Sequence, residues 1–504
     1  MAKITALASE THHLILSYVE AISNGEKEQF EESVKRVVDE RQFPPNVAAT
    51  QPGEKTYKDF LSTFPYNAAL TCTLWGSIIA SRFTRFWDWI AFDATIDPSP
   101  LLAVFAWYMK EYGQNEDEHE EGIYNTEFSF VVFTSASALT EVDKTVERKR
   151  VAAIIQRLQY HIHQCTSVNL KTMCASSLPS SLALFCKKPI YLGELTMDFC
   201  INDMDLKTAW PGSPSNYTSA SLSTELYLST LSLPGFVFME LCVLEGSEDW
   251  FQALSPLTDN NSTLSLHISG FSFEAEDGIY TVEKFASCLS KLQSLEELHL
   301  SNLSLSYDLV DIFPTEKREI APKSLHLDTV SKDFIALFYA LYRCDPLDSA
   351  TFTSCAIPRM LQMIEAPSLE LHNIIDDSKE NEYGVVENSL QRVLAVWLGG
   401  HLTIQACLSF NDDLIQWLST KVHYDSYTWT RVTGMRDTLG WSRFTKKAIV
   451  YHTTKISGRA RMFPAESLDD LTLKDCVDYS ASSLKDFEAA RSDVNLRLEG
   501  LRPA

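Results

Sequence analysis

The sequence lacks the features that identify most secreted proteins and metal-binding domains. Its eleven cysteines are scattered along 504 residues without one Cys-x-x-Cys pair. This pattern excludes a dense disulfide framework and the usual zinc spacing, and it is typical of reduced thiols in a cytoplasmic or nuclear protein. The N-terminal segment mixes polar and apolar side chains, so we expect no signal peptide.

Positive charge is also scarce, and its scarcity restricts the partners. The chain carries 43 Lys and Arg against 67 Asp and Glu, a formal net charge of -24. Such a surface repels phosphate backbones and anionic lipid headgroups, so we expect no nucleic acid and no membrane among the partners. The uncharged stretch 60–81 contains Pro65, Asn67 and many hydroxyls, which favours buried core over a membrane span. A basic or neutral protein partner fits this charge better.

Sequence motifs of catalysis are absent as well. The chain has no phosphate-binding Gly loop, no GxGxxG, no GxSxG and no HExxH. We therefore expect no cofactor, no resident metal and no catalytic residue, and the chain does not look like an enzyme. An enzyme with unrecognised chemistry in residues 1–165 remains an alternative.

What the sequence does contain is a recurring phrase: an apolar residue, two free positions, Leu, one free position and Leu. The clearest copies are Leu295, Leu298, Leu300; Leu192, Leu195, Met197; and Leu468, Leu471, Leu473. One copy cannot bury its apolar face alone, so copies must stack. Segments 282–292 and 334–341 between copies have helical spacing. The pattern predicts an α/β solenoid with parallel strands on its concave face.

The copies can be placed along most of the chain. The expected first Leu of each strand, or its replacement, is Leu195, Leu226, Leu241, Leu264, Leu298, Leu325, Ala350, Leu369, Leu402 and Leu471. The interval between Leu226 and Leu241 is too short for a repeat, which indicates that one of them is wrong. We expect a helical N-terminal cap over 1–60, degenerate repeats or a helical and mixed region over 61–165, the solenoid over 166–480, and a C-terminal tail over 481–504.

The phrase resembles the leucine-rich-repeat superfamily, in particular its cysteine-containing subtype, in which Cys follows the second Leu by three residues. Cys200, Cys355, Cys407 and Cys476 occupy that position, whereas other copies carry Ser269, Leu303, Val330 or Ile374. The resemblance implies a leucine-rich-repeat solenoid. Proteins of this subtype often serve as the substrate-recognition half of F-box ubiquitin-ligase receptors, but no F-box is recognisable in this chain.

Residues between and after the two leucines should point out of the core and form polar columns across the strands. His299, His326 and Glu370 fall in the first column, and His267, Ser301, Asp328 and His372 in the second. We expect these seven residues to bind a partner. The neighbouring histidines could sense pH, or hold a metal with Asp328, but solvated histidines on a polar sheet are the commoner arrangement.

These observations predict a protein-protein interaction module that binds a partner protein on a polar concave face, as a scaffold. The first alternative is the substrate-recognition subunit of a ubiquitin ligase, and the second is the N-terminal enzyme. The sequence does not indicate the identity of the partner or the oligomeric state.

Overall fold

A computed structural model describes residues 89–113, 128–134, 143–204, 226–254, 263–309, 317–375, 389–414 and 448–499, apart from short gaps within these ranges. The chain forms two compact units, Met1–Gly246 and Ser247–Ala504. The boundary between them falls inside the segment 166–480 that the sequence analysis treats as one solenoid. Each unit is described by itself below.

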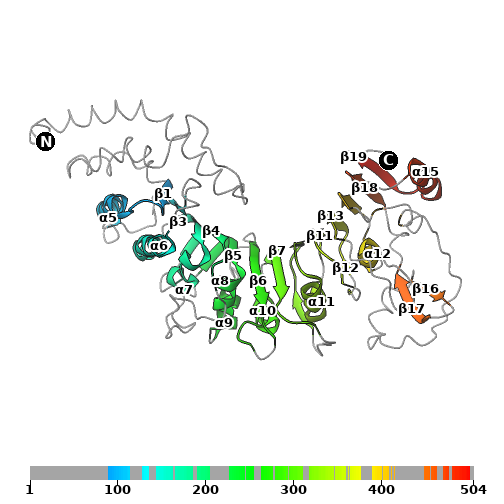
Figure 1. The fold of residues 1–504 in the computed structure, drawn as a ribbon, viewed down its shortest axis with the longest axis horizontal. Coiled ribbons are helices and arrows are strands. Elements are labelled where there is room, and N and C mark those ends of the chain that lie inside the picture. Colours follow the sequence, from blue (N-terminus) through cyan, green and yellow to red (C-terminus); the bar gives the residue numbers. More distant parts are fainter. Residues whose placement is uncertain are drawn as a thin grey trace, which may run out of the picture. The chain divides into compact units, whose positions relative to one another are not determined.

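The first unit is built on five parallel strands that lie side by side in chain order (Figure 1). They are β1 (Trp89–Asp93), β2 (Phe128–Phe133), β3 (Cys165–Cys174), β4 (Ile190–Ile201) and β5 (Leu226–Pro234). The pairing aligns Ile90 with Phe130, Phe130 with Val168, Val168 with Leu195, and Leu195 with Leu231. All five side chains are buried. The strands therefore share one continuous apolar column.

Helices connect these strands. They are α5 (Ser99–Gly113), α6 (Lys144–Leu158), the short 3-10 helix η6 (Ala175–Ser177), α7 (Ser181–Leu184) and α8 (Gly235–Cys242). The α6 helix begins at a cap in which the Asp143 carboxylate accepts a hydrogen bond from the Thr145 amide. Val151, Ile154 and Leu158 on α6 are buried, so this helix covers the apolar column.

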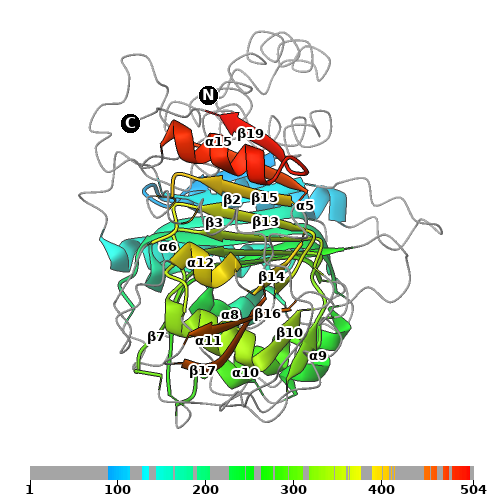
Figure 2. The same ribbon diagram turned by 90° about the vertical axis from the view of Figure 1, so that its right-hand side faces the viewer.

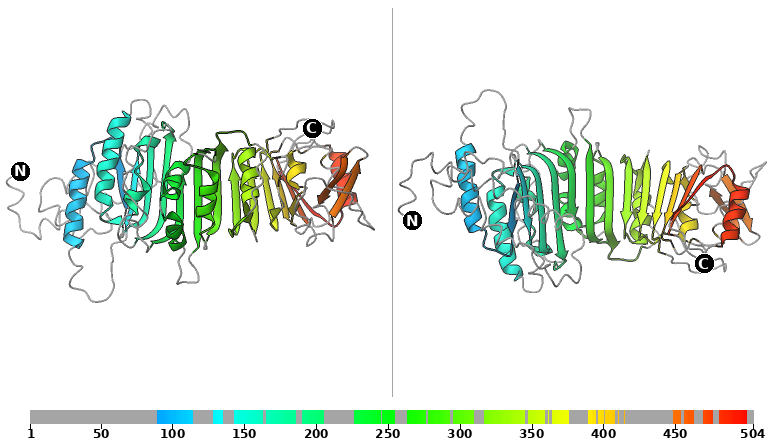
Figure 3. Two further views of the ribbon diagram at one scale, coloured as in Figure 1. Left: turned by 90° about the horizontal axis from the view of Figure 1, so that it is seen from below. Right: turned by 90° about the horizontal axis from the view of Figure 1, so that it is seen from above.

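The second unit repeats the arrangement with eight parallel strands (Figure 3). They are β6 (Leu264–Phe273), β7 (Leu295–Leu305), β9 (Ser324–Asp328), β11 (Ser349–Thr353), β13 (Ser368–His372), β15 (His401–Gln405), β18 (Asp470–Lys474) and β19 (Asn495–Glu499). In β9, β11, β13, β15 and β18 buried apolar residues alternate with outward polar residues, as a half-buried strand requires. The outward residues therefore form continuous columns across neighbouring strands.

The connecting helices of the second unit are α9 (Ser247–Ala253), α10 (Val282–Leu289), α11 (Lys332–Leu341), α12 (Ser389–Leu394) and α15 (Ala481–Ala490). Figures 1 and 2 show α10, α11 and α12 on one side of the strands. The ring centroids of Phe285 on α10 and Phe334 on α11 lie 6.3 Å apart. Each ring also lies 5.2 Å from the ring of Phe273 on β6. The opposite side of the strands carries the polar columns.

Three short pairs complete the second unit. Parallel pairs join β8 (Arg318–Ile320) to β10 (Tyr342–Cys344), and β12 (Ile364–Glu365) to β14 (Trp397–Leu398). An antiparallel pair joins β16 (Ala448–Thr453) to β17 (Ile456–Met462). No helix among the described residues has the length and apolarity needed to cross a bilayer.

The expectation of an α/β fold with many parallel strands is confirmed, and so are the helices expected over 282–292 and 334–341. Three strand positions expected from the repeat are wrong, and one of them is Leu264, because the β6 residue aligned with Leu298 is Leu266. Leu241 lies in helix α8, and the β5 residue aligned with Leu195 is Leu231 rather than Leu226. The competing apolar run of α8 imitates the repeat because this helix is buried on all sides.

The structure describes the two ends of the chain to different extents. The expected helical cap over 1–60 lies outside the described residues. At the other end, the segment expected as a tail contains α15 and β19, and β19 pairs in parallel with β18. Ordered repeat-like structure therefore continues to Glu499.

Candidate binding surface

The candidate surface is the outward face of the strands in the second unit. The register aligns His299 of β7 with His326 of β9, and continues through Thr351, Glu370, Thr403 and Thr472 on the strands that follow. These six positions form the first column that the sequence predicts. The flanking leucines are buried while the column residues are partly exposed, because successive side chains of a strand point to opposite faces.

One predicted column position is wrong. The register places His267 opposite His299, so His267 belongs to the first column and not to the second. The residue opposite Ser301 is Ser269. In β6, Leu264, Leu266 and Ile268 are all buried, so two choices of the Leu pair fit the alternation equally well. The correction brings three histidines onto three adjacent strands, and we call His267, His299 and His326 the histidine column.

The three imidazoles of the histidine column contact one another. The rings of His267 and His299 stack with centroids 4.2 Å apart and planes at 16°. The rings of His299 and His326 lie 5.8 Å apart at 52°. In addition, Nε2 of His267 lies 3.0 Å from the hydroxyl of Ser301 in the second column. The arrangement places three imidazoles next to one another in one part of an otherwise hydroxyl-rich face.

The second column runs through Ser301, Asp328 and Thr353, followed by His372, Gln405 and Lys474. Asp328 therefore lies on the same strand as His326, and its carboxylate accepts a hydrogen bond from the Thr329 hydroxyl at 2.9 Å. On β13, Nε2 of His372 lies 3.2 Å from the Glu370 carboxylate, forming a pair within one strand. The seven predicted residues thus fall into two groups, one on β6, β7 and β9 and the other on β13, separated by β11.

A third column, which the sequence analysis missed, precedes the first. It aligns Ser265 with Glu297, and His401 with Asp470. The Ser265 hydroxyl donates to Glu297 at 3.0 Å, and Nδ1 of His401 lies 2.9 Å from the Asp470 carboxylate. The hydrogen bond from the Asn495 amide is the main cause that lowers the pKa of Asp470; desolvation opposes it, and the hydrogen bond with His401 lowers the pKa further. The sequence contains the signal for the third column, because a residue two positions before the first column must lie on the same face of the strand.

The strands end in a repeated turn. The residue after the second column has a positive φ in seven consecutive repeats: Gly270, Asn302, Thr329, Ser354, Asn373, Ala406 and Asp475, with φ between 49° and 65°. From Thr329 onward, the amide of this residue donates to a carbonyl of the next strand at 2.8–3.0 Å. The left-handed residue therefore extends the ladder by one hydrogen bond while the chain turns away from the sheet.

The residue after the left-handed position is buried in the six repeats from Gly270 to Ala406. This position holds Phe271, Leu303, Val330, Cys355, Ile374 and Cys407. Phe271 therefore replaces Ser269 as the first member of the set, following the corrected register of β6. The thiol of Cys355 donates to the Leu327 carbonyl at 3.3 Å, and that of Cys407 to the Gln405 carbonyl at 3.3 Å. These small side chains fill the turn and satisfy backbone acceptors.

The described thiols are poor nucleophiles. Burial raises the pKa of Cys355 to about 11 and that of Cys200 to about 12. Cys174 has a pKa of about 11, for which burial is the main cause and the nearby carboxylates a second one. Since the thiolate is the reactive form, none of these three suits nucleophilic catalysis at neutral pH. Among the described residues, no three His, Cys, Asp or Glu side chains are placed to hold a metal ion.

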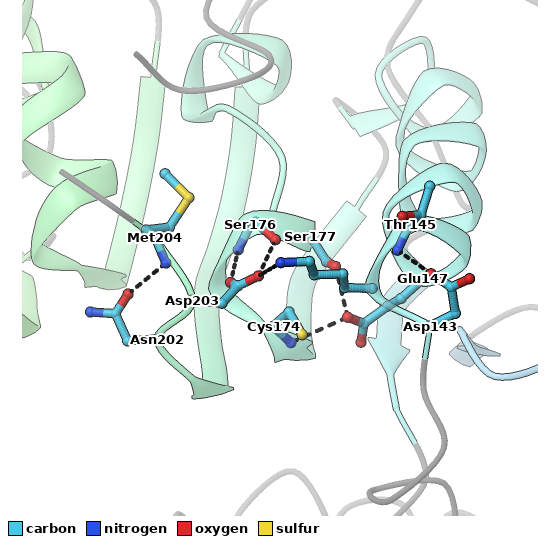
Figure 4. Close-up of polar contacts among 10 residues, drawn as sticks. Asp143, Thr145, Glu147, Cys174, Ser176, Ser177, Asn202, Asp203 and Met204 are labelled. Carbon is cyan, nitrogen blue, oxygen red and sulfur yellow. Dashed lines mark hydrogen bonds and ion pairs between the residues drawn. The ribbon is translucent and has the colours of Figure 1, made fainter. Parts of the chain in front are cut away.

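A dense polar cluster lies in the first unit (Figure 4). Glu147 of α6 is 1% exposed, and its carboxylate accepts hydrogen bonds from the Thr134 hydroxyl at 2.5 Å, the Met173 amide at 2.7 Å and the Ser177 hydroxyl at 2.7 Å. The Cys174 amide adds a fourth at 3.2 Å. These donors occupy the carboxylate fully, so the cluster holds the chain after β3 in place and leaves little for a ligand.

Beside this cluster, Asp203 also holds the chain after β3 in place. It accepts hydrogen bonds from the amide of Ser176 at 2.9 Å and from its hydroxyl at 2.7 Å, and Lys144 lies 3.8 Å away. Further along, the Ser180 hydroxyl donates to the buried Glu240 of α8 at 2.8 Å. Three carboxylates thus fix the segment 176–180, and none of them was recognised in the sequence.

No protein-family model matches the chain, and no curated protein matches it.

Proposed function

We propose that this protein is a protein-protein interaction module, and that its partner binds the outward face of the strands from β6 to β18. The observation that carries the proposal is the continuity of the face: the first and second columns run in register over seven strands, and all their members are polar. A wide polar surface on a rigid sheet suits recognition of another protein.

The architecture supports a leucine-rich-repeat solenoid as the finer description. In the second unit, each repeat consists of a short parallel strand, a left-handed residue and a buried residue. A helix or short strand most often follows. Repetition of one supersecondary unit with a small offset is the rule in solenoids, whose strands line the concave face. On this proposal the polar columns are the concave binding surface.

A test should separate the strand face from the rest of the surface. The tagged full-length chain is purified from its native cells after reversible crosslinking, and the co-purified proteins are identified by mass spectrometry. The face variant combines Thr351→Arg with Thr403→Arg, because both residues lie in the first column and both side chains are partly exposed. The proposal predicts a partner that is captured by the wild type and lost with this variant.

The matched control combines Lys284→Glu with Lys485→Glu, two exposed positions on helices α10 and α15. It alters charge on the same number of surface residues away from the columns. Circular dichroism melting of both variants checks that each remains folded. Capture that is lost equally with both variants, or retained by both, contradicts the proposal.

A second candidate is the substrate-recognition subunit of a ubiquitin ligase. It is favoured by the two buried cysteines at the same turn position, Cys355 and Cys407, since that position defines the cysteine-containing subtype that the sequence resembles. In the same purification this candidate predicts cullin adaptors bound to wild type and face variant alike, together with a second protein lost with the variant. A partner without ligase components contradicts it.

A further inference from the structure

We propose that β19, the last strand of the second unit, pairs with β19 of a second copy of this chain, so that two copies form a closed dimer. Among the described residues, β19 (Asn495–Glu499) has a neighbouring strand on one side only, which is β18 (Figure 1). A sheet edge of this kind presents backbone donors and acceptors to solvent and is a template for a further strand. The dimer contact lies at this edge, whereas the partner protein proposed above binds the polar columns from β6 to β18.

The backbone of β19 directs two of its residues toward the edge. The Asn495 amide donates to the carbonyl just before β18 at 2.7 Å, and the Glu499 carbonyl accepts from the amide just after β18 at 3.0 Å. Because alternate residues of a paired strand bond to the same neighbour, Asn495, Arg497 and Glu499 bond to β18. The N–H and C=O groups of Leu496 and Leu498 therefore point away from β18, toward the position of a further strand.

The apolar side of β19 is only partly covered. The register aligns Leu496 with Leu471, and Leu498 with Leu473 of β18. Leu473 is fully buried, as are its equivalents on the earlier strands of the second unit, whereas Leu498 is 46% exposed. A side chain at a core position thus lies partly in water where the stack of strands ends. A further strand would remove part of this apolar surface from water, which favours its addition.

The charges of β19 favour a second copy of this chain as the added strand. Arg497 and Glu499 lie two residues apart, so both are on the polar face of the strand. In an antiparallel pair that places Leu498 opposite Leu498 of the second copy, Arg497 lies opposite Glu499 of that copy, and the two-fold symmetry repeats the contact. Opposite charges on facing strands attract each other. In this register the two copies of Leu498 also exchange two backbone hydrogen bonds.

The charged neighbour of Glu499 within the chain leaves this contact possible. Glu499 lies 3.9 Å from Lys474 of β18, and both side chains are about half exposed. An ion pair between exposed side chains contributes little to stability. The Glu499 carboxylate can therefore also accept hydrogen bonds from Arg497 of a second copy.

The first strand of the chain's other unit argues against a head-to-tail series of copies. Pairing of β19 with β1 of another copy would leave a new β19 edge each time and generate an open filament. The four β1 residues Ile90–Asp93 are only 1–3% exposed, so an added strand has no access to their backbone. Pairing of β19 with itself uses up both edges and closes after two copies.

The test is sedimentation velocity of the full-length chain over about 1 to about 100 μM protein, a range in which small interfaces associate. Each copy contributes one short strand and carries a net charge of -24, so we expect a weak dimer and use about 150 mM salt to screen long-range repulsion. The disruptive variant is Arg497→Glu, which places like charges opposite each other at both symmetry-related contacts. The rescue variant combines Arg497→Glu with Glu499→Arg, which restores opposite charges in exchanged positions.

The matched control is Lys284→Glu, which makes the same change of charge at an exposed position of α10. Circular dichroism melting checks that every variant is folded. Hydrogen exchange followed by mass spectrometry, at the lowest and the highest protein concentration, locates the contact independently of the variants. Peptides covering 495–499 report on β19, and peptides covering 349–375 report on the middle of the same unit.

The wild type should approach twice the mass of one chain as its concentration rises. Arg497→Glu should weaken dimerisation at least about tenfold, whereas the rescue and control variants should stay within about threefold of the wild type. Exchange over 495–499 should slow at the higher concentration while exchange over 349–375 stays the same. A wild type that remains monomeric throughout, dimerisation unchanged by Arg497→Glu, a rescue variant no tighter than the single variant, or protection only outside 495–499 overturns the inference.

Discussion

The two units stack parallel strands in the same way, yet they hold the ends of those strands by different means. In the first unit the chain leaving β3 is fixed by side chains, since Glu147 accepts from Met173, Cys174 and Ser177. In the second unit the backbone performs this task, because a left-handed residue donates its amide to the next strand. No left-handed residue follows a strand in the described part of the first unit.

The difference teaches where each unit tolerates change. A backbone turn needs only a residue that accepts a positive φ, and the second unit uses Gly, Asn, Thr, Ser, Ala and Asp at that position. The Glu147 carboxylate and its four hydrogen-bond donors form what we call the clamp of the first unit. This clamp needs one residue type at one position.

The largest expected effect comes from breaking the clamp of the first unit with Glu147→Ala. Four buried donors would lose their acceptor, and an unsatisfied buried polar group costs about 1–3 kcal/mol. Partial relaxation should leave a loss of about 3–5 kcal/mol in the free energy of unfolding of this unit. Hydrogen exchange followed by mass spectrometry should show faster exchange over 165–178 and unchanged exchange over 349–375.

The control for this variant is Glu488→Ala, which removes an exposed carboxylate from helix α15. It should change the unfolding free energy by no more than about 0.5 kcal/mol. A loss under about 1 kcal/mol for Glu147→Ala would mean that the clamp does not stabilise the first unit. Equal acceleration of exchange in both units would mean that Glu147 does not stabilise the first unit specifically.

A smaller effect is expected from Cys355→Ala in the second unit. The thiol is fully buried in the turn after β11 and donates to the carbonyls of Leu327 and Thr353. Its removal leaves a small cavity and should cost about 1–2 kcal/mol. Urea unfolding, followed by labelling of the Cys407 thiol, measures the stability of the second unit. Cys200→Ala, at a half-buried cysteine of the first unit, should leave that labelling curve unchanged.

Much of the fold of the second unit could be predicted from the sequence, but the way in which its strands end could not. The Leu pairs of β7 and β9 and the helices around Phe285 and Phe334 follow from simple periodicity. The register of β6 does not, because three alternating apolar residues admit two frames. The left-handed position escapes because seven repeats fill it with several residue types, so no single letter marks it.

The clamp was hidden for a different reason. Val146 fits an apolar stripe by type and is 38% exposed, whereas Glu147 is buried. The usable signal was spacing, since Glu147 precedes the buried Val151 by four residues and so shares its face of α6. A charged residue in an apolar stripe normally indicates the edge of the buried face of a helix. The burial of Glu147 is favourable only because Thr134 and Ser177 donate hydrogen bonds to its carboxylate.

The smallest expected effect tests the backbone turn itself, with a reciprocal pair of variants. Thr329 has φ of 54°, which costs a β-branched residue about 1–2 kcal/mol, and Asn373 occupies the equivalent turn at 49°. Thr329→Asn should therefore stabilise the second unit by about 0.5–1 kcal/mol, since Asn tolerates this conformation and only an exposed hydrogen bond to Asp328 is lost. Asn373→Thr should destabilise it by a similar amount. Calorimetry should show Tm shifts of opposite sign, about 1–3 °C each. Shifts of the same sign would mean that side-chain contacts, rather than the left-handed backbone, decide the stability of these turns.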